Sequence, residues 1–218
     1  MNEKFYLGTY TKRVSKGVYS VTLNKETDQL ESLTLEAAID NPTYLSYSKS
    51  DQLLFAVGKG EEHCGISASN ALTSPVEPLA SYDDQKAVPC YIRYNEKTGD
   101  VLTANYHGGF VELYHYDKEE GAFTFVDKKV HSGSSVHANQ TSPHVHYTDY
   151  TPDEKWIVVC DLGIDTVFTY RRTETGLEEV AEYKTKAGSG PRHLTFHPTL
   201  PIAYLICELD ATVEVLSY

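Results

Sequence analysis

Three residues in the second half of the chain have side chains that together can carry out acid–base chemistry: His144, Arg192 and Glu208. An imidazole or a carboxylate can take a proton from water. A guanidinium can hold a carboxylate or phosphate through two hydrogen bonds, or face an oxygen that becomes negative during a reaction. A site that combines these groups is suited to the hydrolysis or the formation of a lactone.

A unit that occurs four times supplies a frame for these residues. Each copy opens with a proline and one residue of changing chemistry, followed by an alternating apolar strand, a turn and a second β-rich run. The openings are 47, 54 and 48 residues apart, at Pro42-Thr43, Pro89-Cys90, Pro143-His144 and Pro191-Arg192. A period of this length with short strands predicts the blades of a β-propeller.

The remaining segments fit the same architecture. Residues 5–40 predict three strands without a proline-headed one, so the first blade starts at its second strand. The last unit, from residue 191, has three predicted strands, and no segment shows a helical period. The predicted fold class is all-β: a propeller of about five blades whose chain ends inside the fifth. We expect residues 1–218 to form a single propeller domain, truncated at its C-terminus, because an incomplete last blade leaves an open sheet edge.

The first two strands of each unit predict an antiparallel hairpin. It brings the residue after the proline next to a residue 15 to 17 positions later, and we assign the widest spacing, in the fourth unit, to a longer turn. Because the first strand of a blade lines the central channel, we expect all these hairpin ends at one mouth. The predicted pairs are Thr43 with Gly58, Cys90 with Asn105, His144 with Asp161, and Arg192 with Glu208.

Each candidate also has a plainer interpretation. Arg192 and Glu208 can form an ordinary cross-strand salt bridge, His144 can be a hydrogen-bonded strand-end histidine, and Asp161 can cap a turn. His131 lies in a Gly/Ser-rich segment and is expected to be exposed to solvent.

Two further histidines extend the candidate site. His146 lies two positions after His144, on the same face of a strand, and such a pair could ligate a metal ion. No third ligand follows at a recognisable spacing, so we expect neither a metal nor another cofactor. His193 alternates with apolar neighbours and could face the channel. The candidate substrate-binding residues are Asn105, His146, Asp161 and His193.

Composition excludes several functions. The formal net charge of -12 disfavours nucleic-acid binding, since phosphate contact needs clustered Lys and Arg. No stretch reaches about 18 consecutive apolar residues, and the N-terminus lacks the apolar region of a secretory signal. We therefore expect no membrane partner and a cytoplasmic location. The four cysteines are expected to be reduced thiols, and the oligomeric state is left open.

At several motifs the chain resembles the lactonase family of seven-bladed β-propellers, which includes bacterial 6-phosphogluconolactonases and fungal 3-carboxy-cis,cis-muconate lactonising enzymes. The resemblance implies hydrolysis of a small sugar lactone, 6-phosphogluconolactone, in the pentose phosphate pathway. It also assigns the catalytic residues of the family to His144, Arg192 and Glu208. The motifs are NPTYL at 41–45, ANYHGG at 104–109, SPHVH at 142–146, DLGIDTV at 161–167, GPRHLTFHP at 190–198 and EL at 208–209.

Three other functions remain as alternatives: a muconate-type lactonising enzyme, a calcium-dependent sugar lactonase, and a propeller scaffold without catalysis. Scaffolds of the WD-repeat kind carry a Trp-Asp pair in each blade, whereas this chain has one Trp.

Overall fold

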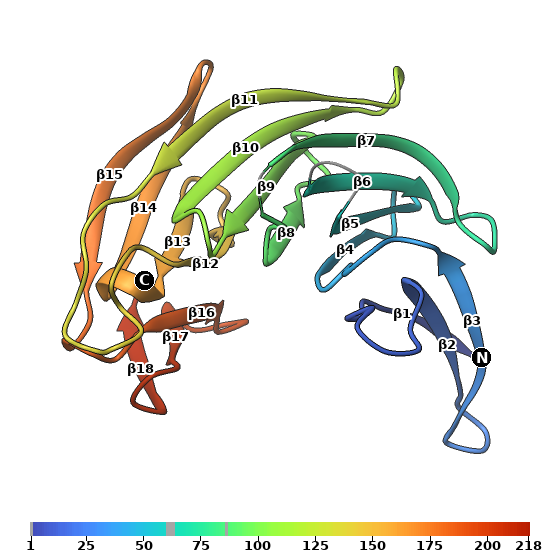
Figure 1. The fold of residues 1–218 in the computed structure, drawn as a ribbon, viewed down its shortest axis with the longest axis horizontal. Helices are drawn as coiled ribbons and strands as arrows, with labels where there is room; N and C mark the ends of the chain where they lie inside the picture. Colours follow the sequence, from blue (N-terminus) through green and yellow to red (C-terminus); the bar gives the residue numbers. More distant parts are fainter. Residues whose placement is uncertain (1, 60–63, 86) are drawn as a thin grey trace. The chain divides into compact units, whose positions relative to one another are not determined.

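The computed structural model describes residues 2–59, 64–85 and 87–218, and these residues form five antiparallel sheets (Figure 1). In every sheet the strands neighbour one another in chain order, as in the blades of a propeller. The first sheet has three strands and the second has four. They are β1 (Glu3–Leu7), β2 (Val18–Asn24) and β3 (Gln29–Ala37), then β4 (Leu45–Ser48), β5 (Leu53–Lys59), β6 (Cys64–Asn70) and β7 (Glu77–Gln85).

The third and fourth sheets have four strands each, and the fifth has three. Their strands are β8 (Tyr91–Tyr94), β9 (Asp100–Asn105), β10 (Phe110–Asp117) and β11 (Ala122–Val130), then β12 (Val145–Tyr150), β13 (Ile157–Asp161), β14 (Thr166–Thr173) and β15 (Gly176–Lys184), then β16 (Pro191–Phe196), β17 (Ile202–Cys207) and β18 (Thr212–Ser217).

Burial along the strands follows their place in each sheet. The second strands of the middle sheets, β9 and β13, are buried at every residue, whereas most residues of the outer strand β15 are exposed. A strand covered on both faces carries continuous apolar residues, and IVVC at 157–160 in β13 is such a run. The all-β prediction and the three-stranded first blade are confirmed.

Two elements were not predicted. Strand β7, with the sequence EPLASYDDQ, lacks clean alternation because it contains a proline and two adjacent carboxylates. The 3₁₀ helix η1 (Leu162–Ile164) is too short to show a period in the sequence.

The described residues form two compact units. One consists of residues 1–100 and 116–124, and the other of residues 101–115 and 125–218. In the first unit Phe55 stacks on Tyr94 with ring centroids 4.3 Å apart and meets Tyr116 edge-on at 5.2 Å. Every candidate catalytic or substrate-binding residue lies in the second unit.

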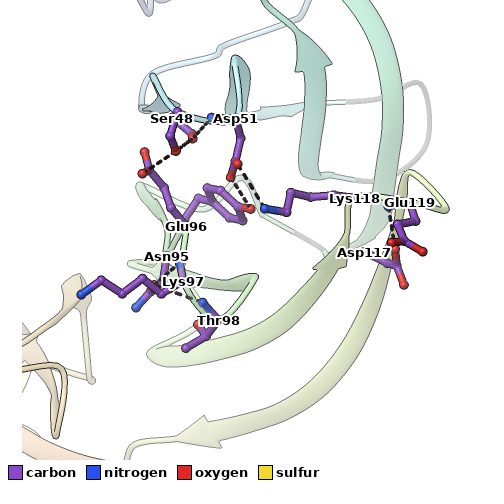
Figure 2. A network of polar contacts seen from close by, with 11 residues as sticks. Ser48, Asp51, Asn95, Glu96, Lys97, Thr98, Asp117, Lys118 and Glu119 are labelled. Carbon is purple, nitrogen blue, oxygen red and sulfur yellow. Dashed lines mark hydrogen bonds and ion pairs between the residues drawn. The ribbon is translucent and has the colours of Figure 1, made fainter.

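A polar network joins the turns of the second and third blades within the first unit (Figure 2). The Tyr94 hydroxyl donates to Asp51 Oδ2 at 3.0 Å, and Lys118 Nζ contacts Asp51 Oδ1 at 3.1 Å. Burial and the neighbouring Asp51 raise the pKa of Tyr94 well above its ordinary value, so the hydroxyl keeps the proton that it donates. These contacts hold neighbouring turns together and are remote in sequence from the candidate site.

Candidate functional site

The hairpin turns of the third, fourth and fifth blades have the same length. Backbone hydrogen bonds close them from Asn95 to Asp100, from Thr151 to Trp156 and from His197 to Ile202, at 2.8, 2.8 and 2.9 Å. The longer turn predicted for the fourth unit is therefore wrong. The additional residues of the fourth unit lie before the turn. Pro143 is two positions farther from Thr151, where its turn begins, than Pro191 is from His197.

A β-bulge shows which residues are equivalent in the fourth and fifth blades. Val145 pairs with Asp161 and Tyr147 with Cys160, so His146 is the extra residue in β12. Between β16 and β17 the same irregularity makes Arg192 the extra residue. Bulges redirect a side chain at the rim of a sheet. His146, rather than His144, is thus the positional equivalent of Arg192.

Arg192 and Glu208 form an ion pair, with Nε and Oε2 2.7 Å apart. The two side chains are 41% and 48% exposed, so solutes can reach them. The contact joins Nε to a carboxylate oxygen, and the guanidinium carries four further N–H groups on its terminal nitrogens. The cross-strand salt bridge considered in the sequence analysis is present, and it leaves one edge of the guanidinium able to meet an anionic oxygen.

His144 lies immediately before β12 and is oriented by Tyr106. Its Nδ1 is 2.9 Å from the Tyr106 carbonyl oxygen, and the two rings stack at 4.2 Å with an interplanar angle of 6°. A carbonyl can only accept, so Nδ1 carries the imidazole proton and Nε2 carries the lone pair. This is the tautomer that a general base needs. Tyr106 was not among the predicted site residues, although it belongs to the ANYHGG motif.

His146 and His193 form an imidazole pair next to Arg192. His146 Nδ1 lies 3.1 Å from His193 Nε2, and the ring of Tyr106 meets His146 edge-on at 5.9 Å. Burial, reinforced by the Arg192 charge, lowers the pKa of His146 to about 4, and burial together with His146 and Arg192 lowers that of His193 to about 4. Both rings are therefore neutral at neutral pH, and one donates to the other.

These two imidazoles should make the free energy of unfolding depend on pH. Their pKa values are lower when folded than the ordinary 6.5, so the unfolded chain binds more protons as pH falls from 6.5 to 4. The folded state should lose about 1–2 kcal/mol per imidazole between pH 7 and pH 5. Chemical denaturation at both pH values measures the difference.

The control for this prediction is the double variant His146→Gln and His193→Gln, which has no titrating ring at either position. Its pH dependence should be flatter than that of the wild type. An equally steep loss of stability in the double variant would contradict the prediction.

Asp161 is fully buried and accepts three hydrogen bonds. Oδ1 accepts from the backbone N–H of His144 at 2.7 Å and of Gly163 at 3.0 Å, and Oδ2 lies 2.7 Å from His131 Nδ1. A side chain at Gly163 would place its Cβ 2.0 Å from the Ser142 carbonyl oxygen, so the close approach of these segments requires glycine. Asp161 caps the turn at Gly163, as the sequence analysis considered, and it also orients the imidazole of His131.

The expectation that His131 is exposed is wrong, because its side chain is 4% exposed and bound to Asp161. Asn105 is also fully buried, and its Oδ1 accepts from the Gly108 N–H at 2.8 Å. The structure thus places Asn105 and Asp161 beneath the accessible rim. Among the other five candidates, the ring of Tyr106 contacts His144 and His146, His146 contacts His193, and Arg192 contacts Glu208. The Arg192 charge also acts on both His146 and His193.

A second buried carboxylate, Asp165, ties the loops that lead to these residues. It accepts from Gln140 at 2.7 Å, from the backbone N–H of Gly188 at 2.7 Å and of Gly190 at 2.8 Å, and it also contacts Ser135. Burial alone would raise its pKa, but these hydrogen bonds lower it below its ordinary value. Asp165 belongs to the DLGIDTV motif at 161–167, but the sequence analysis assigned it no role.

The described ranges omit residues 1, 60–63 and 86. Within these ranges no three His, Cys, Asp or Glu side chains are grouped so that they could hold a metal ion. The same ranges contain no helix with the length and hydropathy needed to cross a membrane. All four cysteines lie within these ranges, and none of them forms a disulfide bond.

Comparison with known proteins agrees with the fold and the motifs. The model of the family described as lactonase, 7-bladed beta-propeller, matches residues 4–218. A Bacillus subtilis protein named 6-phosphogluconolactonase is 34% identical over 98% of this chain and 62% of its own length.

Two solved structures extend the comparison. A Lactobacillus plantarum protein has a TM-score of 0.94 and 36% identity, covering 100% of this chain and 63% of that one. The periplasmic gluconolactonase of Pseudomonas aeruginosa has a TM-score of 0.90 and 26% identity, covering 100% and 65%.

The five sheets define an all-β protein of the propeller class. The chain belongs to the lactonase family of seven-bladed β-propellers. It spans a little under two thirds of the length of the relatives that it matches.

Proposed function

We propose that this chain carries the active site of a lactonase that opens the ring of 6-phosphogluconolactone. The observation that supports the proposal most directly is the accessible Arg192–Glu208 pair, with Nε and Oε2 2.7 Å apart. A histidine held in a basic tautomer, His144, belongs to the same compact unit. The family membership and the B. subtilis relative support the substrate class.

In the proposed mechanism His144 is the general base. Its Nε2 takes a proton from water as the water oxygen attacks the lactone carbonyl, because Nδ1 is committed to the Tyr106 carbonyl. When the tetrahedral intermediate collapses, the bond between the former carbonyl carbon and the ring oxygen breaks. The imidazolium returns the proton to that oxygen, which becomes a hydroxyl group of the open-chain acid. Glu208 is a weaker candidate for this role, since its carboxylate is already engaged by Arg192.

The other residues stabilise charge and orient the substrate. The terminal nitrogens of Arg192 face the carbonyl oxygen as it becomes negative, and Glu208 fixes the direction of the guanidinium. The neutral pair of His146 and His193 borders the guanidinium and can exchange hydrogen bonds with sugar hydroxyl groups. No step requires a metal or a cofactor.

The test is the rate of acid release from freshly made 6-phosphogluconolactone, with the spontaneous rate subtracted, in a protein that spans the full length of the relatives. We expect a clear acceleration that a chelator leaves unchanged. The same assay with unphosphorylated gluconolactone, the lactone in the name of the Pseudomonas relative, measures which of the two lactones this protein prefers. Acceleration of neither substrate would rule out the proposal, and loss of activity with the chelator would favour a calcium-dependent lactonase.

A further inference from the structure

The carboxylate of Asp161 does more than close a turn. Asp161 is the last residue of β13, and Asn105 is the last residue of β9, the equivalent strand of the preceding blade. The turn after β9 is closed by a side-chain amide, whose oxygen accepts from the Gly108 N–H. Asp161 Oδ1 makes the corresponding bond to Gly163 and accepts from the His144 N–H as well. Its second oxygen is not needed for the turn and is used by His131.

His131 connects Asp161 to a second buried residue. Its Nε2 lies 3.0 Å from the Tyr170 hydroxyl, and its ring packs on Phe168 with centroids 4.1 Å apart. Burial, together with Glu179 and Asp161, raises the pKa of Tyr170 far above its ordinary value, so the hydroxyl keeps its proton. When Tyr170 donates to Nε2, the imidazole proton is on Nδ1 and faces Asp161.

The result is a continuous buried chain, Tyr170 to His131 to Asp161, that ends at the backbone of His144. Tyr170 is 1% exposed and Asp161 is 0% exposed, so water does not compete for these bonds. The His144 carbonyl also accepts from the Leu162 N–H at 3.0 Å, and its ring contacts Tyr106 through Nδ1 on the carbonyl and through stacking. The imidazole is thus held at its backbone by Asp161 and at its ring by Tyr106.

We propose that His131 and Tyr170, acting through Asp161, are positioning residues that hold the His144 backbone where the ring Nδ1–H meets the Tyr106 carbonyl. The proposal rests on the proposed role of His144 in lactone hydrolysis. Without the Tyr170 hydroxyl, His131 can rotate or change tautomer, the second oxygen of Asp161 loses its donor, and the carboxylate no longer fixes the His144 N–H. Small displacements of a catalytic group cost activity without weakening substrate binding.

The experiment compares Tyr170→Phe and His131→Asn with the wild type, in a protein of the relatives' full length. We expect kcat to fall about 10-fold in Tyr170→Phe while KM changes by less than about 2-fold. His131→Asn keeps an N–H donor toward Asp161 and should retain more activity than His131→Ala. The matched control is Tyr114→Phe, because Tyr114 is also 1% exposed and donates to a buried carboxylate, Glu112, at 2.7 Å. Its kcat should equal that of the wild type.

A second measurement is independent of activity. Nitrogen-15 spectra of the His144 ring should show one tautomer in the wild type and in Tyr114→Phe, and a mixture in Tyr170→Phe. Unchanged His144 signals, or changed signals with unchanged kcat in an active protein, would overturn the proposal. If the wild type does not hydrolyse lactones, the proposed function fails, and the spectra alone decide whether the chain positions His144.

Discussion

Replacing Arg192 by alanine is expected to lower kcat/KM for lactone hydrolysis by about 10²–10³, the usual effect of removing a donor that faces a developing oxyanion. Arg192→Lys should recover only part of the loss, because an ammonium lacks the planar edge of a guanidinium. Glu208→Gln should have a smaller effect, since the amide retains hydrogen bonding to Arg192 Nε but lacks the charge. Steady-state kinetics on the three variants measures these effects.

The structure provides a matched control for Arg192. Arg171 and Glu178 form an ion pair at 3.4 Å between β14 and β15, with side chains 53% and 57% exposed. Arg171→Ala removes a similar pair away from the site and should leave kcat/KM unchanged. In both alanine variants the free energy of unfolding should fall by no more than about 1 kcal/mol, as for exposed pairs in general. Arg192→Ala with normal activity would show that the pair is only a salt bridge.

Replacing His144 by alanine is expected to lower kcat by about 10²–10⁴, the range for removal of a general base. The acidic limb of the pH–rate profile, where the base becomes protonated, should disappear in the variant. Added imidazole should restore part of the activity if the cavity left by the side chain admits it. Initial rates across pH, with and without imidazole, measure both effects.

His197→Asn is the control for the His144 variant. The His197 ring nitrogen accepts from the backbone of Thr199 and Leu200 at 3.1 and 3.0 Å, and Asn95 makes the same kind of turn cap in the third blade. The control therefore removes an imidazole from the same unit but preserves the local turn. A pH profile that stays intact in His144→Ala would exclude His144 as the base and favour Glu208.

The hydrophobic pattern was sufficient to predict every strand of the sheets except β7. Apolar residues alternate or run continuously in every blade, and the polar turns between them separate the strands, because both signals arise from local backbone geometry and burial. Adjacent hairpin ends were also predictable: Arg192 meets Glu208, and His144 meets Asp161. Both pairs lie within one blade, where chain connectivity alone restricts the separation.

The sequence by itself thus determined an all-β repeat and the types of the reacting groups. Only the tertiary structure decided how those groups are used. Counting from the prolines aligned His144 with Arg192, whereas the bulges align His146 with it, because a bulge adds a residue without changing the hydrophobic alternation that follows. The contacts of His144 with Tyr106, of His146 with His193, and of His131 with Asp161 join different segments of the second unit. Such contacts depend on how strands and loops pack, and no local pattern in the sequence records them.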